Sequence, residues 1–267
     1  DQTRPHVSSL QALIGSIVLA RALRRHWDDQ RHVGILLPPT VAGALLNVAA
    51  LLCGKTSVNL NYTVGKSGLE AAVRLAGLRT IVTSRKFVEK AKLELPEGPS
   101  IVWLEDVARA ISTGPKLTAA LLALCAPARL IERACGQTTP LTMDDLATII
   151  FSSGSTGDPK GVMLSHFNVD ANVQGASQVL HLYQDERVLG ILPFFHSFGY
   201  LVFWLVTLNG QSIVFHPSPL DVTAIGDLVQ RFRLTFLVTT PTFLQLYQRR
   251  CTPEQFSSLR IVLTGAE

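Results

Sequence analysis

The chain has 267 residues, of which 47% are hydrophobic and 16% are charged, so it can bury a large core and is globular rather than disordered. Its formal net charge is +4 at pH 7, but neither a nucleic-acid-binding motif nor interleaved aromatic residues accompany the basic clusters, so we expect no nucleic-acid partner. The clusters are interpreted as solvated helix faces, with a docking surface for an acidic protein or anionic lipid as the alternative. They comprise Arg21, Arg24, Arg25, Arg31, Arg249 and Arg250.

Short β-branched runs alternate with helical patterns along most of the chain, which predicts a layered α/β fold with a parallel sheet. In the first part we expect strands at 33–37, 80–83, 101–104, 148–151 and 161–164 and a short extended stretch after Gly54 through Val58. Helices are expected at 41–53, at 69–75, after the capping residue Ser84, and at 117–134, the last as one long amphipathic helix. A helix is then expected from Ser165 or His166. The later part predicts strands near 188–191, 211–215, 235–238 and 260–263, with helices that start near Asp221 and Pro241.

The cysteine spacing and the longest uncharged stretch bear on whether the chain has a metal site or a membrane-spanning helix. Four cysteines lie far apart among apolar residues, namely Cys53, Cys125, Cys135 and Cys251, which predicts buried reduced thiols of a cytosolic protein and disfavours zinc. No Asp, Glu, Lys or Arg occurs in the stretch 188–220, but Pro193, Gly199 and Gly210 interrupt it. A spanning helix needs about 20 predominantly apolar residues, so we expect buried strand, loop and helix there.

A polar glycine loop at 152–161 separates two apolar strand-like runs. Its glycines let backbone N–H groups converge on an anion, its hydroxyls add donors and its lysine adds positive charge, which is chemistry suited to a polyphosphate. The string matches neither the Walker pattern nor G-x-G-x-x-G, and a surface hairpin of ordinary turn residues is the alternative. The candidate phosphate ligands are Ser152, Ser153, Gly154, Ser155, Thr156, Gly157, Lys160 and Gly161.

The complete string S-S-G-S-T-G-x-P-K-G resembles the phosphate loop of the adenylate-forming, AMP-binding enzymes, which include acyl-CoA synthetases, luciferases and peptide-synthetase adenylation domains. The segment 192–199, L-P-F-F-H-S-F-G, is similar to that family's second signature, and 263–267, L-T-G-A-E, to its third. The resemblance implies the family's αβαβα sandwich, truncated here, with ATP and Mg²⁺ as cofactors and Thr156 on the metal side.

The same resemblance implies roles for residues outside the glycine loop. His196 is expected to be catalytic, lining the pocket where the carboxylate meets ATP, although a histidine beside aromatic residues is more often a satisfied core residue. Gly265, Ala266 and Glu267 are expected to form a backbone ledge against the adenine, or alternatively to be just a strand end. Residues 240–242 are expected near an acyl tunnel, with a plain helix start as the alternative.

Within this family, the segments 34–39, 54–63 and 78–85 look most like the synthetase domain of bacterial acyl-acyl-carrier-protein synthetases. Those synthetases are often fused to a 2-acylglycerophosphoethanolamine acyltransferase. This resemblance implies activation of a fatty acid to acyl-AMP and transfer to a phosphopantetheine thiol, with acyl carrier protein or coenzyme A as the partner. One alternative is an acyl-CoA synthetase or another carboxylate-adenylating enzyme, and the other is a membrane-surface module built on 117–134, with Lys116, Arg129 and Arg133 at its margins.

The resemblance also implies a division of the chain. We expect a first α/β subdomain at 33–187 and an incomplete second one from 1–32 and 188–267, with the family's C-terminal domain absent and this fragment inactive alone. The expected location is cytoplasmic, with peripheral contact of the longer parent protein at the inner face of the bacterial inner membrane.

Overall fold

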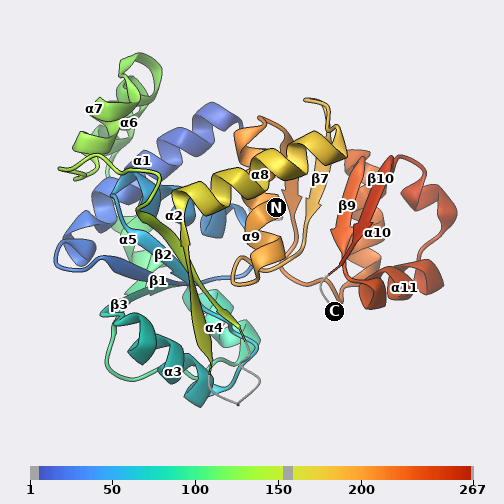
Figure 1. Ribbon diagram of the computed structural model, residues 1–267, viewed down its shortest axis with the longest axis horizontal. Helices are drawn as coiled ribbons and strands as arrows, with labels where there is room; N and C mark the ends of the chain where they lie inside the picture. The colour runs from blue at the N-terminus through green and yellow to red at the C-terminus, as the bar shows by residue number, and fades with distance from the viewer. Residues whose placement is uncertain (1–5, 153–158, 266–267) are drawn as a thin grey trace. The chain divides into compact units, whose positions relative to one another are not determined.

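The structure, a computed structural model, describes residues 6–152 and 159–265, which divide into two compact units (Figure 1). The N-terminal unit comprises Val7–Leu37 and Ala42–Asn168, and the C-terminal unit comprises residues 169–265 with His6 and Pro38–Val41. Each unit has its own sheet with helices on both faces. The α/β class predicted from the alternating pattern is therefore confirmed.

The N-terminal unit is built on a six-stranded sheet of order β4-β3-β1-β2-β5-β6. Its strands are β1 (His32–Leu36), β2 (Thr56–Asn59), β3 (Thr80–Thr83), β4 (Ser100–Trp103), β5 (Leu146–Ser152) and β6 (Lys160–Ser165). Neighbours pair in parallel except β5 and β6, which form an antiparallel hairpin. Strands β2 and β3 are buried along their whole length, as expected of parallel strands covered on both faces.

Helices cover both faces of this sheet. One face carries α1 (Ser9–Trp27), α2 (Val41–Leu52), α5 (Leu104–Ala110), α6 (Thr113–Cys125) and α7 (Ala128–Ala134), and the other carries α3 (Lys66–Ala76) and α4 (Arg85–Ala91). Local signals set their ends: Ser8 caps α1 through a capping box, Gly77 ends α3 in the left-handed conformation, and Ser84 caps α4.

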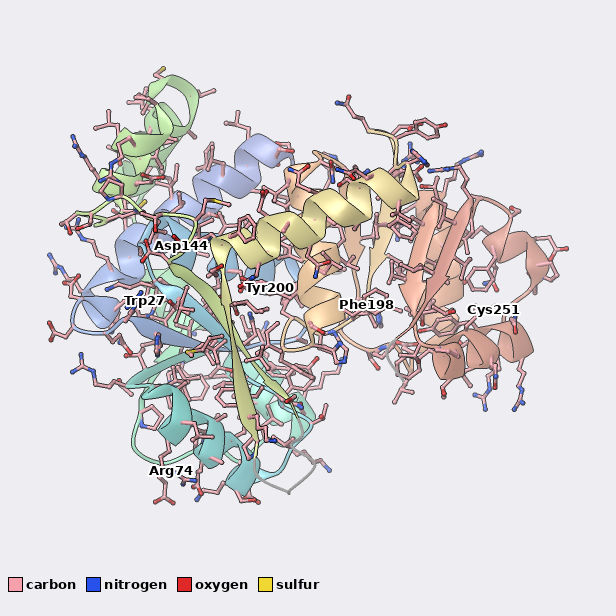
Figure 2. All side chains as sticks on the ribbon, viewed as in Figure 1. Trp27, Arg74, Asp144, Phe198, Tyr200 and Cys251 are labelled. Atoms are coloured by element: carbon pink, nitrogen blue, oxygen red, sulfur yellow. The ribbon has the colours of Figure 1, made fainter. Side chains whose placement is uncertain are left out.

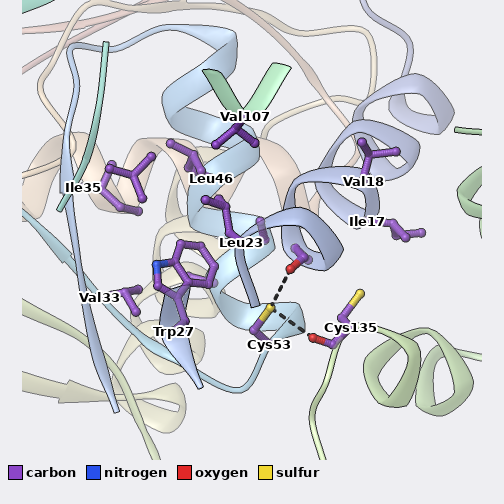
Figure 3. Close-up of a cluster of buried hydrophobic side chains, with 14 of the residues drawn as sticks. Ile17, Val18, Leu23, Trp27, Val33, Ile35, Leu46, Cys53, Val107 and Cys135 are labelled. Atoms are coloured by element: carbon purple, nitrogen blue, oxygen red, sulfur yellow. Dashed lines mark hydrogen bonds between the residues drawn. The ribbon is translucent and has the colours of Figure 1, made fainter. Parts of the chain in front are cut away.

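Helix α1 differs from the expectation that residues 1–32 join the second subdomain. Its residues Ile17, Leu23 and Trp27 are completely buried and pack with Val33 and Ile35 of the N-terminal unit (Figure 3). The side chains thus remove a large apolar area from water against β1, the strand that follows in sequence.

The helix expected at 117–134 is two helices, α6 and α7, separated at Ala126–Pro127. Proline lacks a backbone N–H and disfavours helical geometry in the preceding residue, and Ala126 is accordingly extended at φ −94° and ψ 142°. This break turns one predicted helix into a pair that changes direction at Pro127.

The cysteines follow the prediction only in part. Cys53 and Cys135 are buried, whereas Cys125 is exposed and Cys251 half-buried. Burial raises the pKa of Cys53 to about 12 and that of Cys135 to about 11. The Cys53 thiol donates to the carbonyl oxygens of Ala20 and Cys135 (Figure 3), so both buried thiols stay protonated at neutral pH.

The C-terminal unit has a four-stranded, wholly parallel sheet of order β10-β9-β7-β8. Its strands are β7 (Arg187–Gly190), β8 (Ser212–Phe215), β9 (Phe236–Thr239) and β10 (Ile261–Thr264). Helices α8 (His166–Leu180) and α9 (Ser197–Leu208) contribute to the core on one face, and α10 (Val222–Phe232) and α11 (Pro241–Arg250) to the core on the other, followed by the 3₁₀ helix Pro253–Phe256. The units divide within the first turn of α8 and not at 187, because Leu180 and Leu182 pack on Val188.

The uncharged stretch 188–220 folds as β7, a loop, α9 and β8. Across residues 6–152 and 159–265, no helix is both long enough and apolar enough to cross a membrane.

Glu186 joins the amino ends of the C-terminal strands. Its carboxylate is buried and accepts hydrogen bonds from the Thr235 hydroxyl and the Arg260 guanidinium, including Arg260 Nε at 2.8 Å. Its carbonyl oxygen accepts from the Ser212 N–H at 3.1 Å. Burial raises the pKa of this carboxyl, but the hydrogen bonds from Thr235 and Arg260 outweigh it and hold the pKa below its usual range.

We expect Glu186→Gln to lower the free energy of unfolding at about pH 7 by about 1.5–3 kcal/mol, because charged hydrogen bonds are lost. A lowered folded-state pKa contributes stability above the unfolded pKa of about 4.3, and this is lost as pH falls through the folded value. The two proteins should therefore converge in stability at acidic pH. Urea unfolding across a pH series measures this, with the exposed Asp185→Asn as control. A difference that persists unchanged into acid contradicts the assignment.

Candidate active site

The carboxyl edge of the C-terminal sheet brings three sequence signals to one place. Strand β7 leads into the segment 192–199, β9 leads into 240–242, and β10 leads into Gly265. The chain passes from β7 to β8 on one side and then returns across β7 to β9 on the other, so the connections diverge between β7 and β9. In open α/β sheets, ligands bind in the crevice at such a switch point.

His196 is the N-cap of α9 and is exposed, so it is not the satisfied core histidine that the alternative supposed. The Phe198 N–H donates to its Nδ1 at 3.2 Å, and a nitrogen that accepts a hydrogen bond carries no proton. The neutral ring is therefore protonated at Nε2. This arrangement offers an N–H donor to a carboxylate or phosphate oxygen.

Gly199 allows the turn before α9 to pack closely against the first turn of the helix. A Cβ atom at this position would lie 2.2 Å from the Pro193 carbonyl oxygen and 2.7 Å from that of Leu192. Only glycine allows this approach of two backbone segments. In the sequence, Gly199 is part of the segment 192–199, three residues after His196, but that pattern alone does not indicate this steric role.

Phe198 connects the turn at His196 with the end of β10. Its ring lies 3.6 Å from where a Cβ atom of Gly265 would be, and the Gly265 N–H donates to the Thr239 carbonyl at 3.2 Å. Figure 2 labels Phe198 at the start of α9. The structure therefore brings His196 and Gly265 to the same edge of one sheet, whereas Ala266 and Glu267 lie outside the described residues.

Residues 240–242 make a helix start. Thr240 caps α11 by accepting the Phe243 N–H at 3.3 Å, and Pro241 occupies the first turn. A small apolar cavity nearby in the C-terminal unit, with a volume of about 10 Å³, is lined by residues that include Gly190, Phe194, Phe203 and Val238. It has room for about one water molecule, so it is not an acyl tunnel.

Strands β5 and β6, which flank the glycine loop in sequence, form an antiparallel hairpin in the N-terminal unit. Ser152 and Lys160 are register partners at the mouth of the hairpin, and both are exposed. Directly paired residues project from the same face of a sheet, so the Ser152 hydroxyl and the Lys160 ammonium group lie on one face of the hairpin and could both contact an anion. A Cβ atom on Gly161 would lie 3.2 Å from the Phe151 ring.

The other loop candidates, Ser153, Gly154, Ser155, Thr156 and Gly157, lie outside the described residues, and so does the magnesium assignment to Thr156. Within the described ranges, no group of three or more His, Cys, Asp or Glu residues could hold a metal ion. Mg²⁺ is often held by one or two carboxylates together with waters and substrate phosphates, so it does not require a group of this kind.

Comparison with known proteins identifies the family of the chain. The family model described as AMP-binding enzyme matches residues 17–267, and the chain belongs to this family. It is 27% identical over 249 residues to 4-coumarate–CoA ligase 1 of Arabidopsis thaliana, covering 89% of this chain and 43% of the relative. It is 35% identical to feruloyl-CoA synthase of Amycolatopsis over 129 residues, 47% of this chain and 26% of the relative. The chain spans about half the length of the 4-coumarate–CoA ligases that it matches.

Solved structures agree on the fold. O-succinylbenzoate–CoA synthetase of Bacillus subtilis, in complex with ATP and magnesium ion, matches with a TM-score of 0.76 at 20% identity, over 96% of this chain and 49% of that one. The N-terminal domain of FACL13 from Mycobacterium tuberculosis matches with a TM-score of 0.72 at 19% identity, over 97% of this chain and 62% of that one. The fold is thus that of the N-terminal domain of adenylate-forming enzymes.

Substitutions of His196 distinguish its role as the N-cap of α9 from the role of its Nε2–H as a hydrogen-bond donor to a ligand. We expect His196→Asn to keep the cap, since asparagine is among the best N-cap residues, and His196→Ala to lose about 0.5–2 kcal/mol of stability. Both should reduce adenylate formation in the full-length protein by about 10–150-fold, the value of a hydrogen bond to a charged group. Thermal unfolding and ATP–pyrophosphate exchange measure the two effects. Full activity in His196→Asn contradicts a ligand-facing Nε2.

Gly199→Ala should destabilise the protein by about 1–3 kcal/mol, as overpacking does, and should lower adenylate formation by displacing the turn at His196. The matched control is Gly175→Ala in α8, where a Cβ atom meets nothing within 4 Å; a helical Gly→Ala change there should stabilise by about 0.5–1 kcal/mol. Differential scanning calorimetry distinguishes them. Equal behaviour of the two variants rules out the proposed close approach.

Proposed function

We propose that the chain is the N-terminal part of an AMP-forming acid–thiol ligase. In the first step a carboxylate oxygen attacks the α-phosphorus of ATP, giving acyl-AMP and releasing pyrophosphate. In the second step a thiol attacks the acyl carbon, giving a thioester and AMP. The observation that carries the proposal is the exposed Ser152–Lys160 pair at the hairpin mouth, in a chain that the AMP-binding family matches over residues 17–267.

The residues have distinct tasks in this chemistry. Lys160 and the Ser152 hydroxyl stabilise the β- and γ-phosphates as charge moves onto the departing pyrophosphate. Mg²⁺ supplies further neutralisation of phosphate charge when bound. His196 donates its Nε2–H to an oxygen of the reacting carboxylate or phosphate and orients it, without giving up the proton.

Coenzyme A is the better-supported thiol. The names of the curated relatives, 4-coumarate–CoA ligase and feruloyl-CoA synthase, contain this acceptor. Transfer of a fatty acid to acyl carrier protein depends on the resemblance of segments 34–39, 54–63 and 78–85 alone. Pyrophosphate exchange by the full-length protein over a panel of fatty and aromatic acids selects the acid, and thioester formation with coenzyme A or holo-acyl carrier protein selects the acceptor.

Lys160→Ala in the full-length protein should weaken use of ATP by about 10–150-fold, because one charge-assisted phosphate contact contributes about 1.5–3 kcal/mol. Stability should change little, since the side chain is exposed. Addition of Thr156→Ala should weaken ATP use further. Pyrophosphate-exchange kinetics as a function of ATP measure this, with the exposed Lys90→Ala on α4 as control. ATP kinetics unchanged in folded Lys160→Ala would count decisively against the phosphate assignment.

A further inference from the structure

Helix α6 exposes a row of leucines that has no part in the proposed chemistry. This leucine face consists of Leu117, Leu121 and Leu124, which are 62%, 64% and 64% exposed, and Leu130 at the start of α7 is 49% exposed. Exposed apolar groups scattered singly need no explanation, but contiguous ones mark an interaction surface. Figure 1 shows α6 and α7 together beside α1 within the N-terminal unit.

The leucine face lies opposite the side of α6 that packs on the core. Ala119 is completely buried, and Leu122 and Ala123 pack against the same core cluster. Successive residues of a helix are rotated by about 100° around its axis, so Leu117, Leu121 and Leu124 lie within about 60° of one another around α6. Each of them is rotated by about 140–160° from Ala119, on the opposite side of the helix. A helix that is apolar on every side is ordinarily buried on every side. One of the two apolar faces of α6 therefore needs a second apolar environment.

Basic groups lie along both margins of the leucine face. Lys116 is exposed on one margin, and Arg21 of α1 donates to Thr118 at 2.6 Å on the other. No Asp or Glu occurs between Asp106 and Glu132, and Glu132 is paired with Arg129 at 2.9 Å. Arg133 is exposed beyond this pair. The surroundings of the face are thus net positive.

We infer that the leucine face is a docking surface for an anionic membrane. The three leucines enter the headgroup and upper acyl region, as in helices that lie in the interface plane, while Lys116, Arg21 and Arg133 remain level with the anionic headgroups. Helix α6, with 13 residues, is about 20 Å long and so lies on the bilayer without crossing it.

The composition of the face favours a lipid surface over a protein partner. Interface cores of proteins are enriched in aromatic residues, methionine and arginine, whereas this face presents leucine alone. Electrostatic attraction to anionic lipid adds to apolar burial in such helices, and it accounts for the absence of acidic residues between Asp106 and Glu132. A second copy of the chain would bring two net positive surfaces together, which is unfavourable.

Vesicle flotation tests this proposal with the full-length protein. The probes are vesicles of equal parts phosphatidylglycerol and phosphatidylcholine, and vesicles of phosphatidylcholine alone. The variant is Leu121→Gln with Leu124→Gln, which keeps helix-forming residues and removes no core group. The matched control is Leu75→Gln with Leu208→Gln, at leucines that are each 57% exposed elsewhere. A third protein carries Lys116→Glu with Arg133→Glu.

The unmodified protein and the control should float with the anionic vesicles, and binding should weaken at high salt. The leucine variant should bind about tenfold less or weaker still, and the charge variant should lose the preference for anionic over neutral vesicles. Equal binding by the leucine variant overturns the proposal. So does a dimer that light scattering detects and the leucine variant abolishes, or retention of an acidic carrier protein through this face without vesicle binding.

Discussion

The buried carboxylate of Glu186 sets the geometry on which the C-terminal unit depends. The carboxylate accepts hydrogen bonds from Thr235 and Arg260, which immediately precede β9 and β10. Glu186 itself immediately precedes β7, and its backbone carbonyl accepts from the N–H of Ser212 at the start of β8. The four strands therefore begin level, and each is four residues long. Strands with a common start, direction and length also end level. That is why segments far apart in the chain meet at one edge.

Close backbone approach is the second constraint, and it operates at that edge. Gly199 allows the turn before α9 to fold onto the Pro193 carbonyl, and Phe198 then lies against Gly265. The same turn fixes the orientation of the His196 ring. Its Nδ1 accepts the Phe198 N–H at the start of α9, and Gly199 provides the space for the helix to start at that point. The candidate binding groups in this unit are thus positioned by backbone packing, whereas Ser152 and Lys160 in the other unit are positioned by the register of a hairpin.

The two apolar faces of α6 connect the fold with the proposed chemistry. One face completes the core that also buries Trp27 and Ile17, and the other remains exposed with basic groups at its margins. A ligase that takes an apolar acid gains from a position at the lipid surface, where such acids concentrate because their chains avoid water. The surface proposed for docking lies outside the residues proposed for ATP and carboxylate binding, so the two properties are separable.

By itself the sequence determined the elements and the family. Hydrophobic periodicity predicted the strands and most helices, since burial on one or two faces imposes a repeat on the residues themselves, and the contiguous string 152–161 identified the AMP-binding family. Long-range packing decided the rest. The association of α1 with the first sheet depends on Trp27 meeting β1, and the domain boundary inside α8 depends on Leu180 packing beside Val188. The fit of Gly199 against Pro193 and the exposed side of α6 likewise follow from contacts that no local pattern records, because a side chain's neighbours are set only when distant segments meet.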